Sequence, residues 1–358
     1  MLGSQALSIL AGSQGYPRTV VNGLPKALRY GQNIDPRRAA LSVKHWEDFH
    51  GTGALATGPS GEGGTYDHEV GTAWREFFST LPRETRLLDI ATGNGVIALM
   101  AADYAKEHGL EWSIDGSDLA RIDPVRHVKD GNQRLAGIRF HPGMPNERLA
   151  FDESSFDAVS GHYALEYGDV AATLRAVHPL LRSGGSAQFV LHHAGSPIVE
   201  SARVSLEAAD QVLQQWRLHR KLHRLVTLEG GNENALRKAS DDFVEALRTL
   251  KASWAATQAR GGGAHRMYAL AIESTQRILE GRRALPGSAV GLEVDRAEEG
   301  FRSGARRLSD FIRVAVDDEA MARIAESATT AGFRQIEYSP IALGGTHVVG
   351  WQLTMHRP

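Results

Sequence analysis

The sequence predicts an α/β protein with a mostly parallel sheet of seven strands and a helical insertion between the fifth and sixth strands. Three observations support this fold class. Short apolar runs alternate with helical stretches between residues 85 and 193, which is the pattern of βαβ units. Residues 198–327 contain no strand-like run, and their apolar residues recur at helical spacings of three and four. Two further strand-like runs follow this helical region.

The first five expected strands are short apolar runs bounded by polar or turn-forming residues. They are expected at residues 86–90, 111–115, 138–140, 156–161 and 186–193. Helices are expected between them at about 96–107, 123–133 and 169–182. After the helical region, RQIEYS and THVVGWQLTM are joined by a turn that contains glycine, so the sheet is expected to resume there.

Glycine and proline divide the helical region into roughly four expected helices, because these residues disfavour helix interiors. The breaks are Gly230-Gly231, Gly261-Gly262-Gly263 and Pro286-Gly287. The region follows the fifth strand, where it would overhang the strand ends. It is therefore expected to form a lid over a substrate, a homodimer interface, or both.

The N-terminal segment differs from both of these regions. Residues 1–40 mix turn formers with scattered apolar positions and are expected to lie as an arm over another surface. A glycine-dense loop follows Trp46, and it is either a lid or a disordered surface loop. We therefore divide the chain into an arm with this loop, a ligand-binding domain in two pieces, and a helical insertion. Their expected bounds are 1–64, then 65–198 with 318–358, and 199–317.

The composition favours a small-molecule substrate. The chain has 358 residues and a formal charge of −2 at pH 7, so it lacks the basic balance typical of nucleic-acid binders. It has no cysteine, which excludes disulfides, thiolate metal sites and cysteine nucleophiles. Its N-terminal apolar stretch is too short for a membrane span and has no basic residues before it. A cytoplasmic protein is expected.

The segment LLDIATGNGVIALMAA places an acid and a Gly-x-Gly turn between a strand and a helix. Gly93 and Gly95 allow a sharp turn and a close approach of a ligand to the backbone, and the helix that begins near Val96 offers unsatisfied amide groups. The run from Gly93 to Ala98 also fits the dinucleotide fingerprint, so the glycines alone do not identify the ligand.

The charge of Asp89 favours a ligand with positive charge over a dinucleotide. This carboxylate lies four residues before Gly93, where it would oppose a diphosphate but complement the ammonium and sulfonium groups of S-adenosylmethionine. Asp118 ends the second apolar run, about twenty residues beyond the loop, where a carboxylate can accept both hydroxyls of a ribose. Asp118 therefore indicates a nucleoside without choosing which one.

Several motifs together resemble the class I S-adenosylmethionine-dependent methyltransferases, especially their small-molecule and quinone-type branch. LLDIATGNG is similar to the first motif of that family and GSDLA to the second. The segments LAFDESSFDAVSGHYALEY, LLRSGGSAQFVL and AGFRQIEY resemble its fourth-strand region, its fifth-strand region and the start of its sixth strand. The resemblance covers roughly residues 65–198 and 318–356.

The resemblance implies the Rossmann-like class I methyltransferase fold, S-adenosyl-L-methionine as cofactor, and methyl transfer to an oxygen, nitrogen or carbon atom of a small organic acceptor. The chain departs from the family at several positions, and Ser183 and Ala150 stand where the family commonly has proline. Ala91 stands where the family commonly has glycine, and Met144, Asn146 and Glu147 stand where the family often has an acid for the adenine amino group. The amide oxygen of Asn146 could replace that acid.

The resemblance also implies a set of cofactor-binding residues, with the aromatic ring of Tyr66 closing over the cofactor; the alternative for this segment is a helix cap at Asp67. The implied set is Tyr66, Asp89, Ala91, Thr92, Gly93, Asn94, Gly95, Asp118, Leu119, Met144, Asn146, Gly161, His162 and Tyr163.

Catalytic candidates come from the ends of the fourth and fifth strands, because ligands in open α/β sheets bind outside the carboxyl ends of the strands. His162, Tyr163 and Glu166 follow the fourth strand, and His192 and His193 end the fifth. A histidine there could take a proton from the acceptor, and we favour His162 and His193 together with Glu166. The alternative is that these groups only form hydrogen bonds at the sheet edge, since the activated sulfonium does not require a base.

Two other functions stay open at this stage. One is an NAD-dependent oxidoreductase on the same fold, and the other is a binding or regulatory module without catalysis.

His219 and His223 are four residues apart on one expected helix, a spacing that suits two metal ligands. Because arginine and lysine surround them, a basic solvated helix is the preferred interpretation and no metal site is expected.

Overall fold

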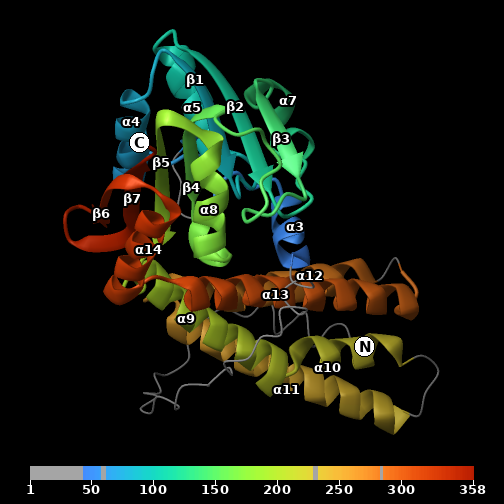
Figure 1. Ribbon diagram of the computed structural model, residues 1–358. Coiled ribbons are helices and arrows are strands. Elements are labelled where there is room, and N and C mark those ends of the chain that lie inside the picture. Colours follow the sequence, from blue (N-terminus) through green and yellow to red (C-terminus); the bar gives the residue numbers. More distant parts are fainter. Residues whose placement is uncertain (1–42, 58–61, 229–232, 283–284) are drawn as a thin grey trace. The chain divides into compact units, whose positions relative to one another are not determined.

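The computed structural model describes residues 43–57, 62–228, 233–282 and 285–358, and the chain divides into two compact units (Figure 1). Within the described residues, one unit comprises 43–200 with 310–358 and contains the sheet, and the other comprises 201–309 and is helical. The expected N-terminal arm at 1–40 lies outside the described residues, and so do residues 58–61 of the glycine-dense loop that follows Trp46.

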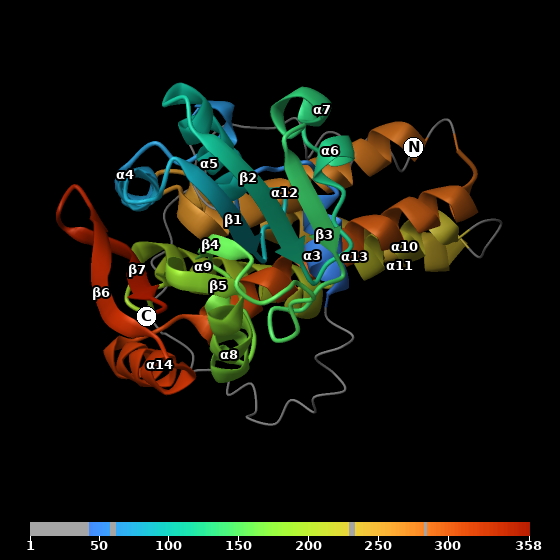
Figure 2. The ribbon, with the colours of Figure 1, turned by 45° about the horizontal axis from the view of Figure 1, so that its top comes forward.

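The sheet has seven strands in the order β3-β2-β1-β4-β5-β7-β6 (Figure 2). The strands are β1 (Glu84–Ile90), β2 (Glu111–Asp118), β3 (Ile138–Pro142), β4 (Phe156–His162), β5 (Leu181–His192), β6 (Arg334–Leu343) and β7 (His347–His356). Neighbouring strands from β3 to β5 are parallel, whereas β7 is antiparallel to both β5 and β6. The predicted seven-stranded, mostly parallel sheet is therefore confirmed.

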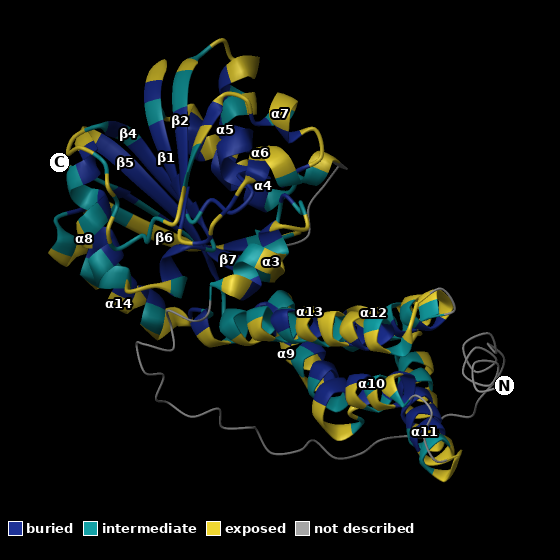
Figure 3. Ribbon diagram, turned by 90° about the vertical axis from the view of Figure 1, so that its right-hand side faces the viewer, coloured by how far each residue is buried: buried dark blue, intermediate teal, exposed yellow. Residues whose placement is uncertain are grey.

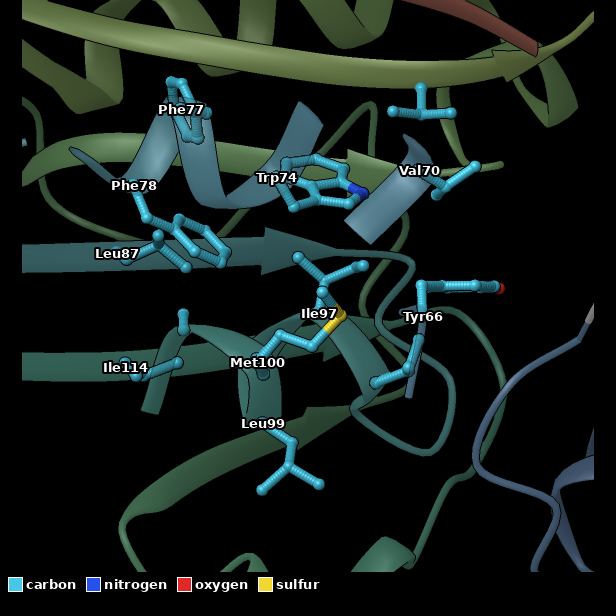
Figure 4. Close-up of a cluster of buried hydrophobic side chains, with 14 of the residues drawn as sticks. Tyr66, Val70, Trp74, Phe77, Phe78, Leu87, Ile97, Leu99, Met100 and Ile114 are labelled. Atoms are coloured by element: carbon cyan, nitrogen blue, oxygen red, sulfur yellow. The ribbon is translucent and has the colours of Figure 1, made fainter. Parts of the chain in front are cut away.

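Helices cover both faces of this sheet, which explains why the central strands are apolar on both sides. On one face, α4 (Glu69–Ser79) and α5 (Val96–Glu107) bury the side chains that Figure 4 shows around Trp74, Phe78 and Ile97. On the other face, α8 (Val170–Leu180) and α14 (Asp318–Ala331) bury a second cluster. Both layers converge on the buried strands β1, β4 and β5 (Figure 3).

Local signals in the sequence start and stop these helices. Asp169 and Asp317 cap α8 and α14, because their carboxylates accept hydrogen bonds from backbone amides three residues later, at 2.9 and 2.8 Å. Gly332 ends α14 with a left-handed φ of 108°.

The helix expected at 123–133 is two short helices, α6 (Pro124–His127) and α7 (Gly131–Arg134). The backbone turns between them, where Asp130 has a left-handed φ of 57°. The sheet unit also contains α3 (Lys44–His50) and two 3-10 turns, η1 (Glu62–Gly64) and η2 (Leu165–Tyr167).

The helical unit has a hydrophobic core of its own, with Phe243, Leu247 and Leu250 fully buried. Its elements, some of which extend into the other unit, are α9 (Pro197–Asp210), a π-helical turn (Gln211–Gln215), α10 (Leu218–Thr227), α11 (Glu233–Thr257), α12 (Gly262–Gly281) and α13 (Gly287–Val314).

The prediction of roughly four helices in this region was therefore too coarse. Arg217 adopts a left-handed φ of 51° between the π-helical turn and α10, and it divides the first expected helix. Residues 315–317 separate α13 from α14, and Val316 there forms an isolated β-bridge with His193. Within the described ranges, no helix combines the length and the apolar character that a membrane span requires.

Candidate functional site

The carboxyl end of β1 holds a buried acid, Asp89, whose side chain is already bound within the protein. The hydroxyl groups of Thr92 and Ser160 donate hydrogen bonds to its two oxygens, at 2.6 and 2.8 Å. Burial raises the pKa of Asp89 to about 7, although these two hydrogen bonds oppose the shift. The group therefore titrates near neutrality, so a cation placed beside it would favour its charged form.

A second buried acid, Asp118, lies at the end of β2 and holds the loop that follows β1. One of its carboxylate oxygens accepts a hydrogen bond from the amide of Gly93 at 2.9 Å, and the other accepts from the amide of Ala120 at 2.7 Å. Burial raises the pKa of Asp118 to about 6, against the effect of these two bonds. The structure thus brings together the two acids that the sequence singled out, one on each side of the glycine-rich turn.

The backbone of the β1 loop is left-handed at three of the predicted positions. Gly93 and Gly95 have φ values of 55° and 85°, and Ala91 has a φ of 48°. This conformation suits glycine and costs an L-residue about 1 kcal/mol. The backbone of Ala91 thus keeps the shape that glycine adopts readily, which explains why the departure from the family pattern is tolerated.

The loop after β3 contains the residues proposed for the adenine contact. The Oδ1 atom of Asn146 is buried and has no hydrogen-bond partner among the described residues. Glu147 is engaged elsewhere, because its carboxylate accepts a hydrogen bond from the amide of Asp169 at 2.9 Å. The amide of Met144 donates to the carbonyl of Asp118 at 2.8 Å, and Leu119 is 50% exposed. Among Met144, Asn146 and Glu147, Asn146 is the residue with a buried side-chain oxygen that has no hydrogen-bond partner among the described residues.

Helix α3 packs on the loop after β1, a contact that the sequence analysis did not predict. The side-chain amide of Asn94 donates hydrogen bonds to the carbonyls of His50 and Ala54, at 3.0 and 2.8 Å. The ring of His50 is buried against Gly93, where an added Cβ would lie 2.6 Å from the His50 Cε1 atom. The side-chain nitrogen of Asn94, a predicted cofactor contact, thus binds the segment that contains α3.

The same helix reaches the loops after two further strands. Glu47 accepts a hydrogen bond from the amide of Arg121 at 3.2 Å, beyond β2. Trp46 packs edge-on against Tyr167, beyond β4, with ring centroids 5.5 Å apart. Helix α3 thus contacts the loops after β1, β2 and β4, which are the loops where ligands of open α/β sheets bind.

His162 lies buried among aromatic rings at the end of β4. The indole N–H of Trp74 donates to its Nδ1 atom at 3.2 Å, and the ring of Tyr66 lies 4.6 Å away. Burial lowers the pKa of His162 well below its usual value, so the ring is neutral. Because an indole nitrogen can only donate, the remaining proton of His162 is on Nε2, which has no partner among the described residues. His162 can therefore donate a hydrogen bond to a ligand from Nε2.

Gly161, the neighbouring predicted contact, has a structural reason to be glycine. An added Cβ at this position would lie 2.8 Å from the ring of Phe189 and 3.2 Å from the Cβ of Ala164.

His192, at the end of β5, is paired with Glu166. One carboxylate oxygen of Glu166 lies 2.7 Å from Nδ1 of His192 and accepts a hydrogen bond from its backbone amide at 2.9 Å. The His192 ring also packs against Tyr163 and Phe311, with centroids 3.7 and 4.2 Å away. Burial lowers the pKa of His192, and Glu166 partly offsets this shift. With Nδ1 donating to Glu166, the Nε2 atom of His192 keeps its lone pair and can accept a proton.

His193, the other candidate base at the end of β5, lies apart from this group. Its ring packs against Trp351 with centroids 4.9 Å apart, and its Nδ1 accepts from the amide of Gly195 at 3.0 Å. Successive side chains on a strand point to opposite faces, so only one of the two adjacent histidines could join the cluster. The structure brings together His162, Tyr163, Glu166 and His192, and it leaves His193 on the other face.

The histidine pair of α10 is separated as well. His219 is buried beside Phe301, whereas His223 lies 3.6 Å from a carboxylate oxygen of Asp295. A group of three or more side chains suited to a metal ion does not occur in the part of the chain that the structure describes.

Comparison with known proteins gives one curated relative of note. The chain is 30% identical over 109 residues to a demethylmenaquinone methyltransferase of Chlorobaculum parvum. The match covers 30% of this chain and 41% of the relative, so less than half of the relative's length is represented. No family model matches the chain.

Solved structures superpose on this chain only with low TM-scores. An S-adenosylmethionine-dependent methyltransferase from Mesorhizobium loti is 27% identical, with 35% of this chain and 56% of that chain covered at a TM-score of 0.28. A candidate methyltransferase from Methanococcus maripaludis is 11% identical, with 94% and 97% covered at a TM-score of 0.40.

The strand order of the sheet unit is more informative than these superpositions. A dinucleotide-binding sheet has the order 3-2-1-4-5-6, whereas here an antiparallel β7 lies between β5 and β6. The sheet unit therefore has the class I methyltransferase fold, and its sequence resembles the S-adenosylmethionine-dependent methyltransferases of that class.

Proposed function

We propose that the protein transfers a methyl group from S-adenosylmethionine to an oxygen, nitrogen or carbon atom of a small organic acceptor. The observation that carries this proposal is the buried carboxylate of Asp89, which titrates near pH 7 beside the left-handed turn after β1. A negative group at this place favours a ligand with positive charge over a diphosphate. The resemblance to a demethylmenaquinone methyltransferase supports the same choice.

The residues at the ends of β1, β2 and β3 fit such a cofactor. Asp89 would face the ammonium group and Asp118 the ribose hydroxyls, since each carboxylate has about four acceptor positions and uses only some of them within the protein. The unpartnered oxygen of Asn146 would accept from the adenine amino group, and the exposed side chain of Leu119 would cover the adenine ring. When bound, the cofactor supplies a methyl group on a sulfonium, whose sulfur keeps the bonding electrons as a thioether.

The two buried histidines at the ends of β4 and β5, His162 and His192, have different roles in this proposal. The Nε2 atom of His192 would take the proton that the acceptor atom loses. The acceptor atom would supply the electron pair of the new bond to the methyl carbon. Glu166 acts as a positioning residue, because it fixes the orientation of the His192 ring through Nδ1. His162 is a hydrogen-bond donor to the ligand in this scheme, and His193 has no role in it.

The acceptor is proposed to be a flat, aromatic molecule. The rings of Tyr163 and Phe311 flank His192, and Tyr66 and Tyr167 lie in the same group of aromatic contacts. Rings of this kind bind aromatic surfaces by stacking and edge-to-face contacts. A lid or a homodimer interface formed by the helical insertion stays a prediction from its place in the sequence.

Substitution of the two neighbouring histidines tests the acid–base assignment. We expect His192→Phe to lower kcat by roughly 100-fold or more, since general-base catalysis contributes about that much, while S-adenosylhomocysteine still binds in a calorimeter. His193→Phe is the matched control and should leave kcat within about twofold. Turnover is measured with radiolabelled S-adenosylmethionine and a panel of phenols, hydroquinones and aromatic amines.

The same measurements separate the alternatives. Failure to bind S-adenosylhomocysteine would refute the proposed function, and tighter binding of NADH would favour an oxidoreductase. Binding of S-adenosylhomocysteine without turnover of any acceptor would favour a regulatory module. A loss of activity in His193→Phe that equals the loss in His192→Phe would contradict the role of His192.

A further inference from the structure

The amino-acid end of the proposed cofactor is a zwitterion, so its site needs partners for a carboxylate as well as for an ammonium group. Asp89 can serve only the ammonium group. Backbone amides of a glycine-rich loop often bind anions, but three amides of this loop are already engaged. Those of Thr92, Gly93 and Gly95 donate to the carbonyl of Ser117, the carboxylate of Asp118 and the carbonyl of Thr92, at 2.9, 2.9 and 2.8 Å.

A side-chain donor lies beside this loop on α3. The imidazole of His50 is 6% exposed and lies directly against Gly93, so close that an added Cβ on this glycine would overlap the ring. The two hydrogen bonds from the side chain of Asn94 to the carbonyls of His50 and Ala54 fix the end of α3 at this place. An imidazole N–H is a good donor to a carboxylate in either charge state of the ring.

We propose that the imidazole of His50 binds the carboxylate of the cofactor's amino-acid portion, so that α3 completes the cofactor site from outside the sheet. This inference rests on the proposed function. It assigns opposite charges of one ligand to two residues: the cation to Asp89 at the end of β1, and the anion to His50 on α3. Because a side chain on Gly93 would overlap the His50 ring, this position must remain a glycine.

A pair of ligands that differ only at the amino-acid end provides the test. S-adenosylhomocysteine carries the carboxylate, and 5′-methylthioadenosine has the same nucleoside and a thioether without the amino acid. We expect His50→Ala to weaken binding of S-adenosylhomocysteine by roughly 10- to 100-fold, the usual effect of losing a hydrogen bond to a charged group. Binding of 5′-methylthioadenosine should change by less than about twofold. Both affinities are measured by calorimetry with the full chain.

Two further variants separate recognition of the carboxylate from docking of the helix. His45 is a second buried histidine of α3, and it pairs with Asp310 at 2.8 Å. We expect His45→Ala to change the affinities for the two ligands by the same factor, because any effect would come from docking alone. His50→Gln keeps a hydrogen-bond donor and a similar volume, so it should show a smaller loss that is again confined to S-adenosylhomocysteine.

Each result has one interpretation. Equal losses for the two ligands in His50→Ala and His50→Gln would overturn the inference, since His50 would then only dock the helix. An unchanged affinity for S-adenosylhomocysteine in both variants would overturn it as well, while leaving the proposed function intact. If the wild-type protein binds neither ligand, the proposed function itself fails.

Discussion

Asp89 combines burial with two hydroxyl donors, and this combination makes its charge depend on pH near neutrality. The folded-state pKa of about 7 lies above the value of 3.8 expected for an unfolded chain. The folded protein therefore binds the proton more tightly, and the stabilisation from this group is fully present below the unfolded pKa. It is lost as the pH rises through the folded pKa.

We expect the free energy of unfolding of the wild-type protein to fall relative to that of Asp89→Asn as the pH rises. Between pH 5 and pH 8 the difference should change by about 3 kcal/mol, from the pKa values of the folded and unfolded states. Urea denaturation at several pH values measures it. The variant Asp152→Asn, at an exposed position, is the matched control for the removal of one carboxylate. A parallel pH dependence in the wild type and Asp89→Asn would contradict the assignment.

The same residue couples cofactor binding to protons. If the ammonium group of S-adenosylhomocysteine lies beside Asp89, it lowers the pKa of that carboxyl and releases a proton from the fraction of molecules that is protonated at pH 7. Calorimetry in two buffers with different ionisation enthalpies should therefore show proton release on binding. Asp89→Asn should abolish it. Net proton uptake by the wild-type protein would contradict this placement of the cation.

The catalytic candidates show what single-residue reasoning could and could not reach. The pattern of strand ends located His162, Glu166 and the histidine pair at the end of β5. Strand alternation also predicts that the two histidines of that pair point to opposite faces, because His192 shares a face with the buried Val190 of the α4–α5 side, whereas His193 continues the face of Leu191. The tautomer of His162 could not be inferred, since it depends on Trp74, which is distant in the sequence.

At the level of elements, local patterns predicted best where one short segment contains all the information. The bounds of α5 and the start of β2 agree with the sequence expectation, because an apolar period and a glycine turn define them. The role of α3 was missed, since a helix of seven residues has little periodicity and its contacts lie more than forty residues away. The left-handed break at Arg217 was missed because arginine gives no turn signal.

Helix α3 should loosen when its link to the loop is removed. Asn94→Ala deletes both hydrogen bonds to the carbonyls of His50 and Ala54, so we expect faster amide hydrogen exchange across residues 44–57. Exchange in α8, on the face of the sheet opposite α4 and α5, serves as the internal control and should not change. Equal exchange in the variant and the wild type would show that α3 is held by its other contacts.

At the scale of the whole molecule, the chain has separate hydrophobic cores in the sheet unit and in the helical unit. We expect Phe243→Ala in the helical core to lower the stability of that unit by about 3–5 kcal/mol, the usual cost of removing a buried phenylalanine. The affinity of the sheet unit for S-adenosylhomocysteine should persist.

Scanning calorimetry with and without S-adenosylhomocysteine measures both effects. The matched variant Phe156→Ala, in the sheet core, should lower the transition that the ligand raises. A single transition that both variants shift equally would mean that the two cores unfold as one.

The position of β7 sets the order in which the sheet can be assembled during synthesis. The strand is the seventh along the chain, yet it pairs with β5 on one side and β6 on the other. Five parallel strands can associate while translation continues, but the edge of β5 stays open until residues 347–356 have left the ribosome. An exposed strand edge invites pairing with other chains, so nascent molecules are most prone to aggregate during this interval.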